Sequence, residues 1–243
     1  MCTVTFIPIR DKVFITSNRD EKNWRSPAWA PAIYPYRTGQ LLFPKDSFAG
    51  GTWIAVHESG RAIVFLNGAW ISHAPAKNYA RSRGLVLLEL IDNPDPPGLF
   101  NRIILEQIEP FTSIIYENGN LHECRWDGIR KYSKIIDAGK PQIWSSATLY
   151  SPEMAMRRDQ WFETWLKLHS MASQEDILEF HRNSGDGNPN HDLLMNRNDM
   201  VYTVSITSLA IGQDKALMVY QDLKNNRQSK KELSLAKAIP LRP

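Results

Sequence analysis

The order of strands and helices constrains this chain most, because its helical segments come in pairs. Helical periodicity, bounded by proline or by a capping serine, predicts helices at 77–92, 96–109, 152–169 and 173–183. Runs rich in Val, Ile, Phe and Thr predict strands before, between and after these two pairs. A doubly wound parallel sheet needs one helix between every two strands, so the observed order predicts an α+β fold with mainly antiparallel sheets and helix pairs outside them.

Short turns predict that neighbouring strands form hairpins. The first hairpin joins residues 3–9 to 13–17, and another follows the segment GGTW at 50–53. Between these hairpins, residues 22–49 interleave four prolines with aromatic side chains, which predicts a long ordered loop. The basic end at 224–242 is expected to have little secondary structure.

Composition excludes several classes of function. The 243 residues are 42% hydrophobic and contain no repeat or linker, so they predict a single domain over 1–243. A net charge of only +3 is too weak a bias to argue for nucleic acid or an acidic membrane as a partner, and we expect no nucleic acid. The sequence has no secretory signal, no apolar run of membrane-spanning length and only two cysteines, so we expect a cytoplasmic protein without a membrane span or structural disulfide.

Cys2 is the residue whose surroundings the first hairpin predicts. In an antiparallel hairpin, the residue numbers of two facing residues always add up to the same value. A turn centred on Asp11 gives a sum of 22, which sets Cys2 opposite Asp20. A shift of half a residue replaces Asp20 by Arg19 or Glu21. Every register therefore predicts an arginine and a carboxylate beside Cys2.

This arrangement suits a nucleophile that carries its own base. Aminopeptidases remove Met1 when the second residue is small, which would give Cys2 a thiol of pKa about 8.5 and an amine of pKa about 7.7–8.0. The amine can accept the thiol proton, and a neighbouring Arg19 would lower the thiol pKa. Asp20 would hold the ammonium in place. The alternative is that Cys2 is a small apolar residue entering a strand and that residues 17–21 form a charged turn.

The combination of MC at the start, NRDE at 18–21 and GGTW at 50–53 resembles the NRDE family, also called the transport-and-Golgi-organisation family. That family is similar to the cysteine N-terminal-nucleophile hydrolases, which include choloylglycine hydrolases and penicillin V acylase. The resemblance implies a four-layer αββα sandwich with two mainly antiparallel sheets between helix pairs. It also implies cleavage of an amide C–N bond in a small or lipid-linked substrate.

The resemblance assigns roles to individual residues. Cys2 matches the nucleophile, Asp20 the aspartate near the freed amine, and Asn67 an asparagine of the oxyanion hole. Three positions depart from the hydrolases. Arg19 lies one step later than their arginine, a second oxyanion asparagine falls near Ser145-Ser146, and a late arginine falls near Val204. With Arg19, the predicted catalytic set is therefore Cys2, Arg19, Asp20 and Asn67, and Asn18, Gly51 and Trp53 are predicted to bind the ligand.

A second function class remains open, which is a non-catalytic carrier or chaperone for haem or an acyl lipid that uses the same cleft. The resemblance associates the family with haem mobilisation and with lipid or acyl-CoA homeostasis. The six histidines are scattered and no Cys-x-x-Cys-His motif is present, so we predict no metal site and no resident cofactor, with haem only as a ligand. Cys124, in the middle of a strand, is expected to be inert.

Overall fold

The computed structural model of the chain describes residues 3–73 and 78–236, within which two seven-stranded sheets form. The first sheet runs β10 (Gln142–Ser145), β1 (Thr3–Ile9), β2 (Lys12–Lys22), β12 (Val201–Ile211), β13 (Lys215–Asp222) and β14 (Arg227–Ser234), and β11 (Asn196–Arg197) pairs with β12. The second runs β3 (Trp29–Tyr36), β4 (Gly39–Lys45), β5 (Ile54–His57), β6 (Ala62–Asn67), β7 (Phe111–Glu117), β8 (Asn120–Trp126) and β9 (Lys131–Ile136). Neighbouring strands in both sheets are antiparallel, as predicted.

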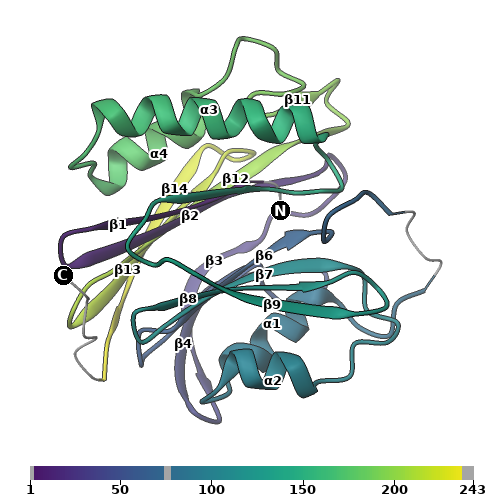
Figure 1. Cartoon of the computed structure of the whole chain (residues 1–243), viewed down its shortest axis with the longest axis vertical. Helices are drawn as coiled ribbons and strands as arrows, with labels where there is room; N and C mark the ends of the chain where they lie inside the picture. The colour runs from purple at the N-terminus through teal and green to yellow at the C-terminus, as the bar shows by residue number, and fades with distance from the viewer. Residues whose placement is uncertain (1–2, 74–77, 237–243) are drawn as a thin grey trace.

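The two sheets pack face to face, and a helix pair covers each outer face (Figure 1). The helices are α1 (Arg83–Ile91) and α2 (Pro96–Arg102) on the second sheet, and α3 (Pro152–Leu168) and α4 (Gln174–Asn183) on the first. Helix α4 begins with a capping box between Ser173 and Asp176, the start signal seen in the sequence. The predicted layered α+β sandwich is therefore confirmed, although α1 and α2 are shorter than the helices expected at 77–92 and 96–109.

Strand alternation decides which side chains enter the core between the sheets. Val4 and Phe6 of β1 and Ile15 of β2 belong to a core that also contains Ile54 and Val64 of the second sheet. The intervening side chains point to the helix layer, where Ile7 and Phe14 pack with Phe162 and Phe180. Odd-numbered residues of β2 therefore face the second sheet, and even-numbered ones face α3 and α4.

The NRDE segment lies within a buried strand, so the alternative that residues 17–21 form a charged turn is wrong. Strand β2 continues from Lys12 to Lys22, and Asn18, Arg19 and Asp20 are all buried in it. Their polar groups are tolerated because each one has partners on its own side of the sheet, as described below. The β1–β2 register pairs Thr3 with Asn18, an index sum of 21, which is the alternative that sets Arg19 opposite position 2. Cys2 itself lies outside the described residues.

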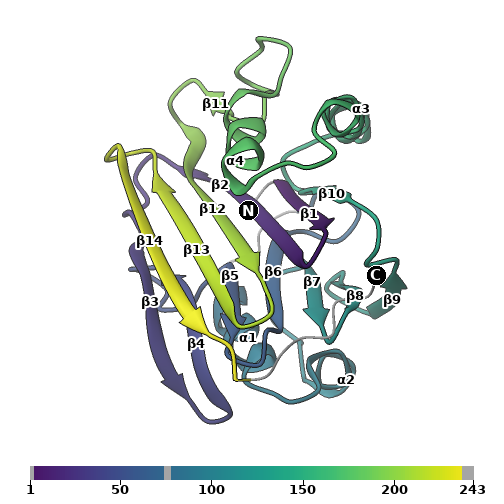
Figure 2. The ribbon, with the colours of Figure 1, turned by 90° about the vertical axis from the view of Figure 1, so that its left-hand side faces the viewer.

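The prediction of a loop over residues 22–49 was wrong, because most of this segment forms the hairpin β3–β4. Strand β3 is the edge strand of its sheet, so Pro31 and Pro35 can lack an N–H donor without leaving a neighbouring strand unpaired. The pairing is also irregular between Trp29 and Ala32, next to Pro31. In Figure 2, β3 and β4 lie beside β13 and β14 of the other sheet.

The expectation of an unstructured basic end was also wrong for part of that segment. Strand β14 pairs with β13 over its whole length, from Arg227 opposite Asp222 to Ser234 opposite Lys215. Its side chains are mostly exposed and charged, as is common in an edge strand that must avoid pairing with another chain. Residues 237–243 of the predicted end lie outside the described residues.

Candidate functional site

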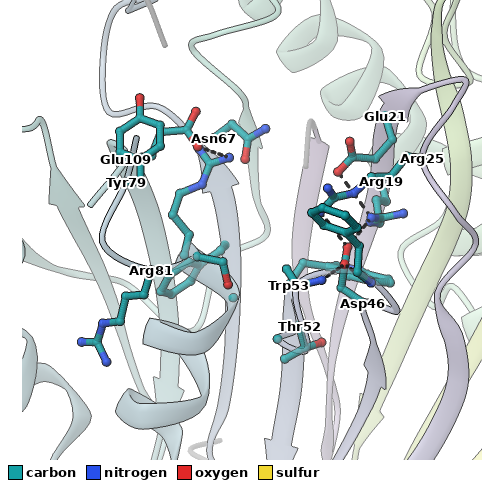
Figure 3. Close-up of a pocket in the computed structure, with 17 residues that line it drawn as sticks. Arg19, Glu21, Arg25, Asp46, Thr52, Trp53, Asn67, Tyr79, Arg81 and Glu109 are labelled. Carbon is teal, nitrogen blue, oxygen red and sulfur yellow. Dashed lines mark hydrogen bonds and ion pairs between the residues drawn. The ribbon is translucent and has the colours of Figure 1, made fainter. Parts of the chain in front are cut away.

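A pocket of about 350 Å³ opens between the two sheets and the start of α1. Arg19, Arg25 and Trp53 stand on one side of it, and Asn67 and Tyr79 on the other (Figure 3). The lining contains both signs of charge, with the arginines Arg19, Arg25, Arg81 and Arg83 and the carboxylates Glu21, Asp46 and Glu109. Four of the predicted site residues line this pocket, namely Arg19, Gly51, Trp53 and Asn67.

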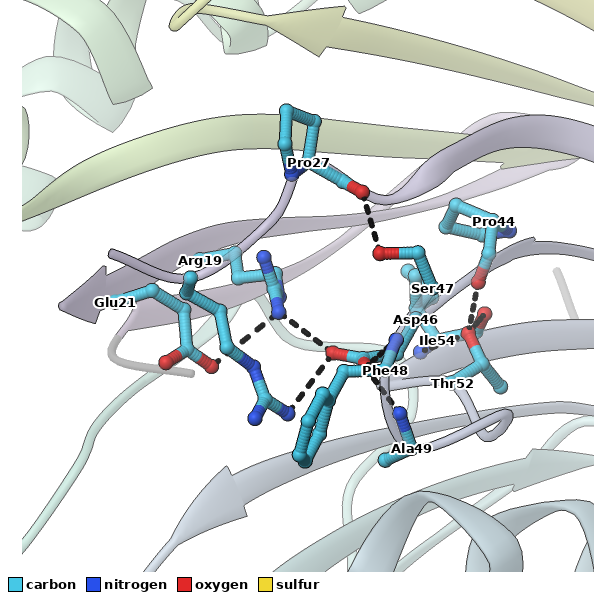
Figure 4. Close-up of polar contacts among 11 residues, drawn as sticks. Arg19, Glu21, Pro27, Pro44, Asp46, Ser47, Phe48, Ala49, Thr52 and Ile54 are labelled. Carbon is cyan, nitrogen blue, oxygen red and sulfur yellow. Dashed lines mark hydrogen bonds and ion pairs between the residues drawn. The ribbon is translucent and has the colours of Figure 1, made fainter. Parts of the chain in front are cut away.

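Arg19 is held rigidly at one side of the pocket. Its Nη2 donates to Asp46 Oδ2 at 2.7 Å and lies 3.4 Å from Glu21 Oε1 (Figure 4). Its guanidinium also lies over the Trp53 ring, with Cζ 4.7 Å from the ring centroid. Only 3% of the arginine is exposed, so its charge acts in a partly water-excluded environment where electrostatic effects on a neighbouring group are strong.

Asp46 is the anchor of this arrangement, and the sequence interpretation missed it. One carboxylate oxygen accepts from the backbone N–H groups of Phe48 and Ala49, and the other accepts from Arg19 and Arg25. Burial alone would raise the pKa of Asp46, but the Ala49 N–H and the positive charges of Arg25 and Arg19 outweigh it and lower that pKa. The available signal was the segment DSFAGG, since an aspartate that caps its own following turn is common before glycine.

Asn67 is the last residue of β6, and Gly68 ends the strand with a positive φ of 78°. The Asn67 side chain lines the pocket on the side opposite Arg19. The Asn67 backbone carbonyl accepts a hydrogen bond from Ser146 Oγ at 2.9 Å. Ser146 follows β10, which pairs with β1, so the position expected for a second oxyanion donor lies beside Asn67. A serine hydroxyl at this place supports the Asn67 backbone.

Gly51 permits a close approach between the GGTW segment and helix α1. A Cβ at Gly51 would lie 2.4 Å from the backbone carbon of Gly84, at the start of α1, and a Cβ at Gly84 would lie 2.7 Å from the Thr52 carbonyl oxygen. Two glycines thus meet backbone to backbone, which sets the first turn of α1 against the pocket. The following Trp53 is 5% exposed, and within the described residues its Nε1 has no hydrogen-bond partner.

Replacing Gly51 by alanine is expected to destabilise the protein by about 1–3 kcal/mol, because the added methyl group overlaps backbone atoms that cannot rotate away. Urea-induced unfolding measures this change. Gly139→Ala is the matched control, because the only atom near its Cβ is Asp137 Oδ1, at 3.2 Å. Equal unfolding midpoints for Gly51→Ala and the wild type would contradict the close approach.

Asn18 and Asp20 lie on the other face of β2 and do not line the pocket. Asp20 accepts hydrogen bonds from the Tyr150 hydroxyl at 2.8 Å and from the Thr203 hydroxyl at 2.6 Å. The bulge opposite Asp20 and Arg19 contains Val204, the position expected for a late arginine, and its side chain is buried. Arg19 and Asp20 are thus adjacent in sequence but serve opposite sides of the first sheet.

Asn18 holds a buried histidine in one tautomer. Its amide nitrogen donates to the carbonyls of His181 and Leu193, so its oxygen is left to accept from His181 Nδ1 at 2.6 Å. The other ring nitrogen, Nε2, then accepts from the Thr5 hydroxyl at 2.8 Å. Burial, reinforced by the positive charge of Arg158, lowers the pKa of His181 to about 3, so the ring is neutral.

The pKa of His181 is lower in the folded protein than in the unfolded chain, where it is about 6.5. The contribution of the neutral ring to the free energy of unfolding is therefore complete at pH values above about 6.5. This stability is lost as the pH falls toward the folded value of about 3, by at most about 1.4 kcal/mol per pH unit. We expect His181→Gln to be less stable than the wild type at neutral pH but to lose less stability on acidification. Urea unfolding between about pH 7 and pH 5 tests this, and parallel curves would contradict it.

Of the two cysteines, only Cys124 lies within the described residues. Cys2 lies outside the described residues, so its predicted position beside Arg19 and Asp20 stays a prediction. Cys124 is fully buried in β8, and burial, with a smaller contribution from Glu123, raises the pKa of its thiol to about 11. A thiol with that pKa is protonated at neutral pH, as expected for an inert cysteine.

Neither a membrane-spanning helix nor a metal cluster is found in the described part of the chain. None of the helices within 3–73 and 78–236 is both long and apolar enough to cross a bilayer. In the same ranges, no group of three or more His, Cys, Asp or Glu side chains is arranged to hold a metal ion.

The architecture is shared with solved structures of a bile acid hydrolase and an acid amidase. A mutant conjugated bile acid hydrolase from Clostridium perfringens superposes with a TM-score of 0.60 at 10% identity, covering 100% of this chain and 99% of that chain. The Caenorhabditis elegans ortholog of N-acylethanolamine-hydrolyzing acid amidase superposes with a TM-score of 0.57, also at 10% identity, covering 86% of this chain and 92% of that chain. At this identity the likeness establishes the N-terminal-nucleophile hydrolase fold alone. No curated protein sequence matches the chain.

A family model assigns the chain more specifically. The model described as Transport and Golgi organisation 2 matches residues 1–181, which include the NRDE and GGTW segments and every element up to α4. This match covers well over half of the sequence. The chain therefore belongs to the Transport and Golgi organisation 2 family and has the fold of the N-terminal-nucleophile hydrolases.

Proposed function

We propose that the protein is a cysteine amidohydrolase that cleaves the C–N bond of a small or lipid-linked amide. The observation that supports this most is the pair Arg19 and Asn67, which stand on opposite sides of one pocket. Cys2 directly precedes Thr3, whose hairpin partner is Asn18, the neighbour of Arg19. Cys2 also has the same parity as Val4 and Phe6, the β1 residues that belong to the core between the sheets.

In the proposed reaction, the α-amine freed by loss of Met1 takes the proton of the Cys2 thiol. The thiolate attacks the carbonyl carbon of the amide, and the side-chain amide of Asn67 stabilises the negative oxygen that forms. The amine returns the proton to the leaving nitrogen, and water then hydrolyses the thioester. Arg19 lowers the thiol pKa, and Asp20, on the other face of β2, positions the strand end through Tyr150 and Thr203.

The name of one structural neighbour supports an amide as substrate class, since an N-acylethanolamine is an acyl amide. The pocket also contains polar groups that suit such a ligand. Trp53 Nε1 and Ser82 Oγ are buried, line the pocket and are without a partner in the described ranges. An amide carbonyl, or an oxygen elsewhere on the substrate, can accept from either of these donors.

Selective modification of the thiols tests this function directly. Because Cys124 is buried with a raised pKa, a thiol reagent at neutral pH should label only Cys2 in the folded protein, and both cysteines after denaturation. We expect intact mass to show that Met1 is absent, and turnover of a panel of acyl amides to fall in proportion to the label. Retention of Met1, or turnover that persists after full labelling of Cys2, would contradict the proposal.

A non-catalytic carrier of haem or an acyl lipid is the second candidate. It is favoured by Ser146 and Val204, which replace the asparagine and arginine expected from the hydrolases. If the protein is a carrier, we expect saturable binding of haemin or an acyl lipid and no release of an amine from any amide. Haemin titration by absorbance, run beside the amide panel, separates the two functions.

A further inference from the structure

The loop that follows β2 and the end of the β3–β4 hairpin carry exposed aromatic side chains beside basic ones. Trp24 is 66% exposed, Trp29 57% and Phe48 78%. We call this surface the aromatic–basic patch and define it by the residues Lys22, Trp24, Arg25, Trp29, Lys45 and Phe48. Large exposed aromatic side chains grouped on one surface are characteristic of an interaction site.

Each aromatic ring of the aromatic–basic patch has a cation next to it. Lys22 Nζ lies 5.7 Å from the centroid of the Trp24 ring, and Lys45 Nζ lies 5.5 Å from that of Trp29. The guanidinium carbon of Arg25 lies 5.0 Å from the Phe48 ring centroid. Each of the three rings therefore has a positive charge beside it.

Backbone pairing within the β3–β4 hairpin and a side-chain hydrogen bond from this hairpin to the loop after β2 hold the patch together. Trp29 pairs with Lys45 across the β3–β4 hairpin, and the Ser47 hydroxyl donates to the Pro27 carbonyl at 2.8 Å. Beside them, Lys224 Nζ donates to the Asn23 carbonyl at 3.0 Å and adds another positive charge. Figure 2 shows this corner of the molecule, where the loop after β2 lies next to the turn between β13 and β14.

The positive charge of the aromatic–basic patch favours an anionic partner. Three of the four basic side chains in residues 22–49 belong to the patch, and the one acidic side chain, Asp46, is buried against Arg19 and Arg25. The fourth, Arg37, lies near Asp92 at the other end of the hairpin. A second copy of the chain would bring like charges together. An anionic lipid surface instead offers phosphates to the lysines and an interfacial layer in which tryptophan and phenylalanine rings are favoured.

We propose that the aromatic–basic patch docks the protein on membranes that contain anionic phospholipids. The contact is interfacial, with the three rings at headgroup depth and the lysines on the phosphates. This inference does not depend on the proposed hydrolase activity. Arg25 and Phe48 also line the pocket, so the docked protein would hold the pocket mouth near the lipid surface.

Vesicle co-sedimentation of the full-length protein tests the proposal. Vesicles of equal parts phosphatidylcholine and phosphatidylserine should bind the wild type, and vesicles of phosphatidylcholine alone should bind it at least about tenfold more weakly. Added salt should weaken binding to the anionic vesicles. Trp24→Ser combined with Trp29→Ser, and separately Lys22→Gln combined with Lys45→Gln, should each reduce binding about tenfold or more.

The matched control is Ile129→Ser combined with Lys140→Gln, an exposed apolar and basic pair near β9, at the opposite edge of the second sheet. This variant should bind like the wild type. Absence of binding to anionic vesicles, or an equal loss in the control, would overturn the proposal. So would a wild type that sediments alone as an oligomer that the tryptophan variant abolishes, because the patch would then join copies of the chain.

Discussion

Replacing Cys2 by alanine is expected to abolish hydrolysis of any amide that the wild type turns over. The thiol is the only group in the proposed reaction that forms a bond to the substrate, and the base that serves it is the amine of the same residue. Loss of the nucleophile in enzymes of this kind lowers kcat by at least about a thousandfold. The free amine remains, since alanine at position 2 also permits removal of Met1.

The control for this experiment is Cys124→Ala, which removes the other thiol far from the pocket. We expect this variant to keep its kcat within about a factor of two, because Cys124 does not line the pocket and its thiol is protonated at neutral pH. Binding of a slow or product-like ligand should survive in Cys2→Ala. Equal turnover by Cys2→Ala and the wild type would show that the thiol takes no part in the reaction.

Replacing Asp46 by asparagine is expected to destabilise the protein by about 3 kcal/mol at neutral pH. Asparagine keeps an oxygen for the N–H groups of Phe48 and Ala49, so the change removes mainly the charge that faces Arg19 and Arg25. Arg19 would then remain buried beside only the half-exposed Glu21, at 3.4 Å. Urea unfolding at neutral pH measures the effect.

The pH dependence of this difference follows from the lowered pKa of Asp46. A carboxylate whose folded pKa lies below its unfolded value of about 3.8 stabilises the fold above that value, and this stability is lost as the pH falls through the folded pKa. The gap between wild type and Asp46→Asn should therefore be constant near neutral pH and shrink in strong acid. Glu232→Gln, which breaks the exposed pair with Lys215, should cost no more than about 0.5 kcal/mol. Equal costs for the two variants would contradict the role of Asp46.

Element order could be predicted from the sequence because the apolar runs and helix caps are local signals. The hairpin that follows GGTW and helices α3 and α4 lie where those signals place them. The edge strand β3 could not be recognised, since proline is excluded from interior strands and tolerated at edges. Which strand becomes an edge depends on the assembled sheet and not on the segment itself.

The candidate site shows the same difference between residues that local sequence signals mark and residues whose role depends on the assembled fold. Arg19 was found through the NRDE motif and Asn67 through the resemblance to the hydrolases, and both line one pocket. Arg25 and Asp46 were missed because their roles arise from the contact between the NRDE strand and the loop after β4, which pattern reasoning does not bring together. Asn18 and Asp20 were grouped with Arg19 by sequence, whereas strand alternation sends them to the helix layer, where they bind His181, Tyr150 and Thr203.

Strand β1 also limits how sequences of this family can vary. One residue inserted or deleted within β1 would exchange the faces of the segment before it, bringing Thr3 between the sheets and sending Val4 to the helices. The turn between Ile9 and Lys12 can lengthen without this cost, since hairpin loops of about three to five residues are also common. We therefore expect natural relatives to vary in length at this turn and to lack single-residue insertions or deletions within β1.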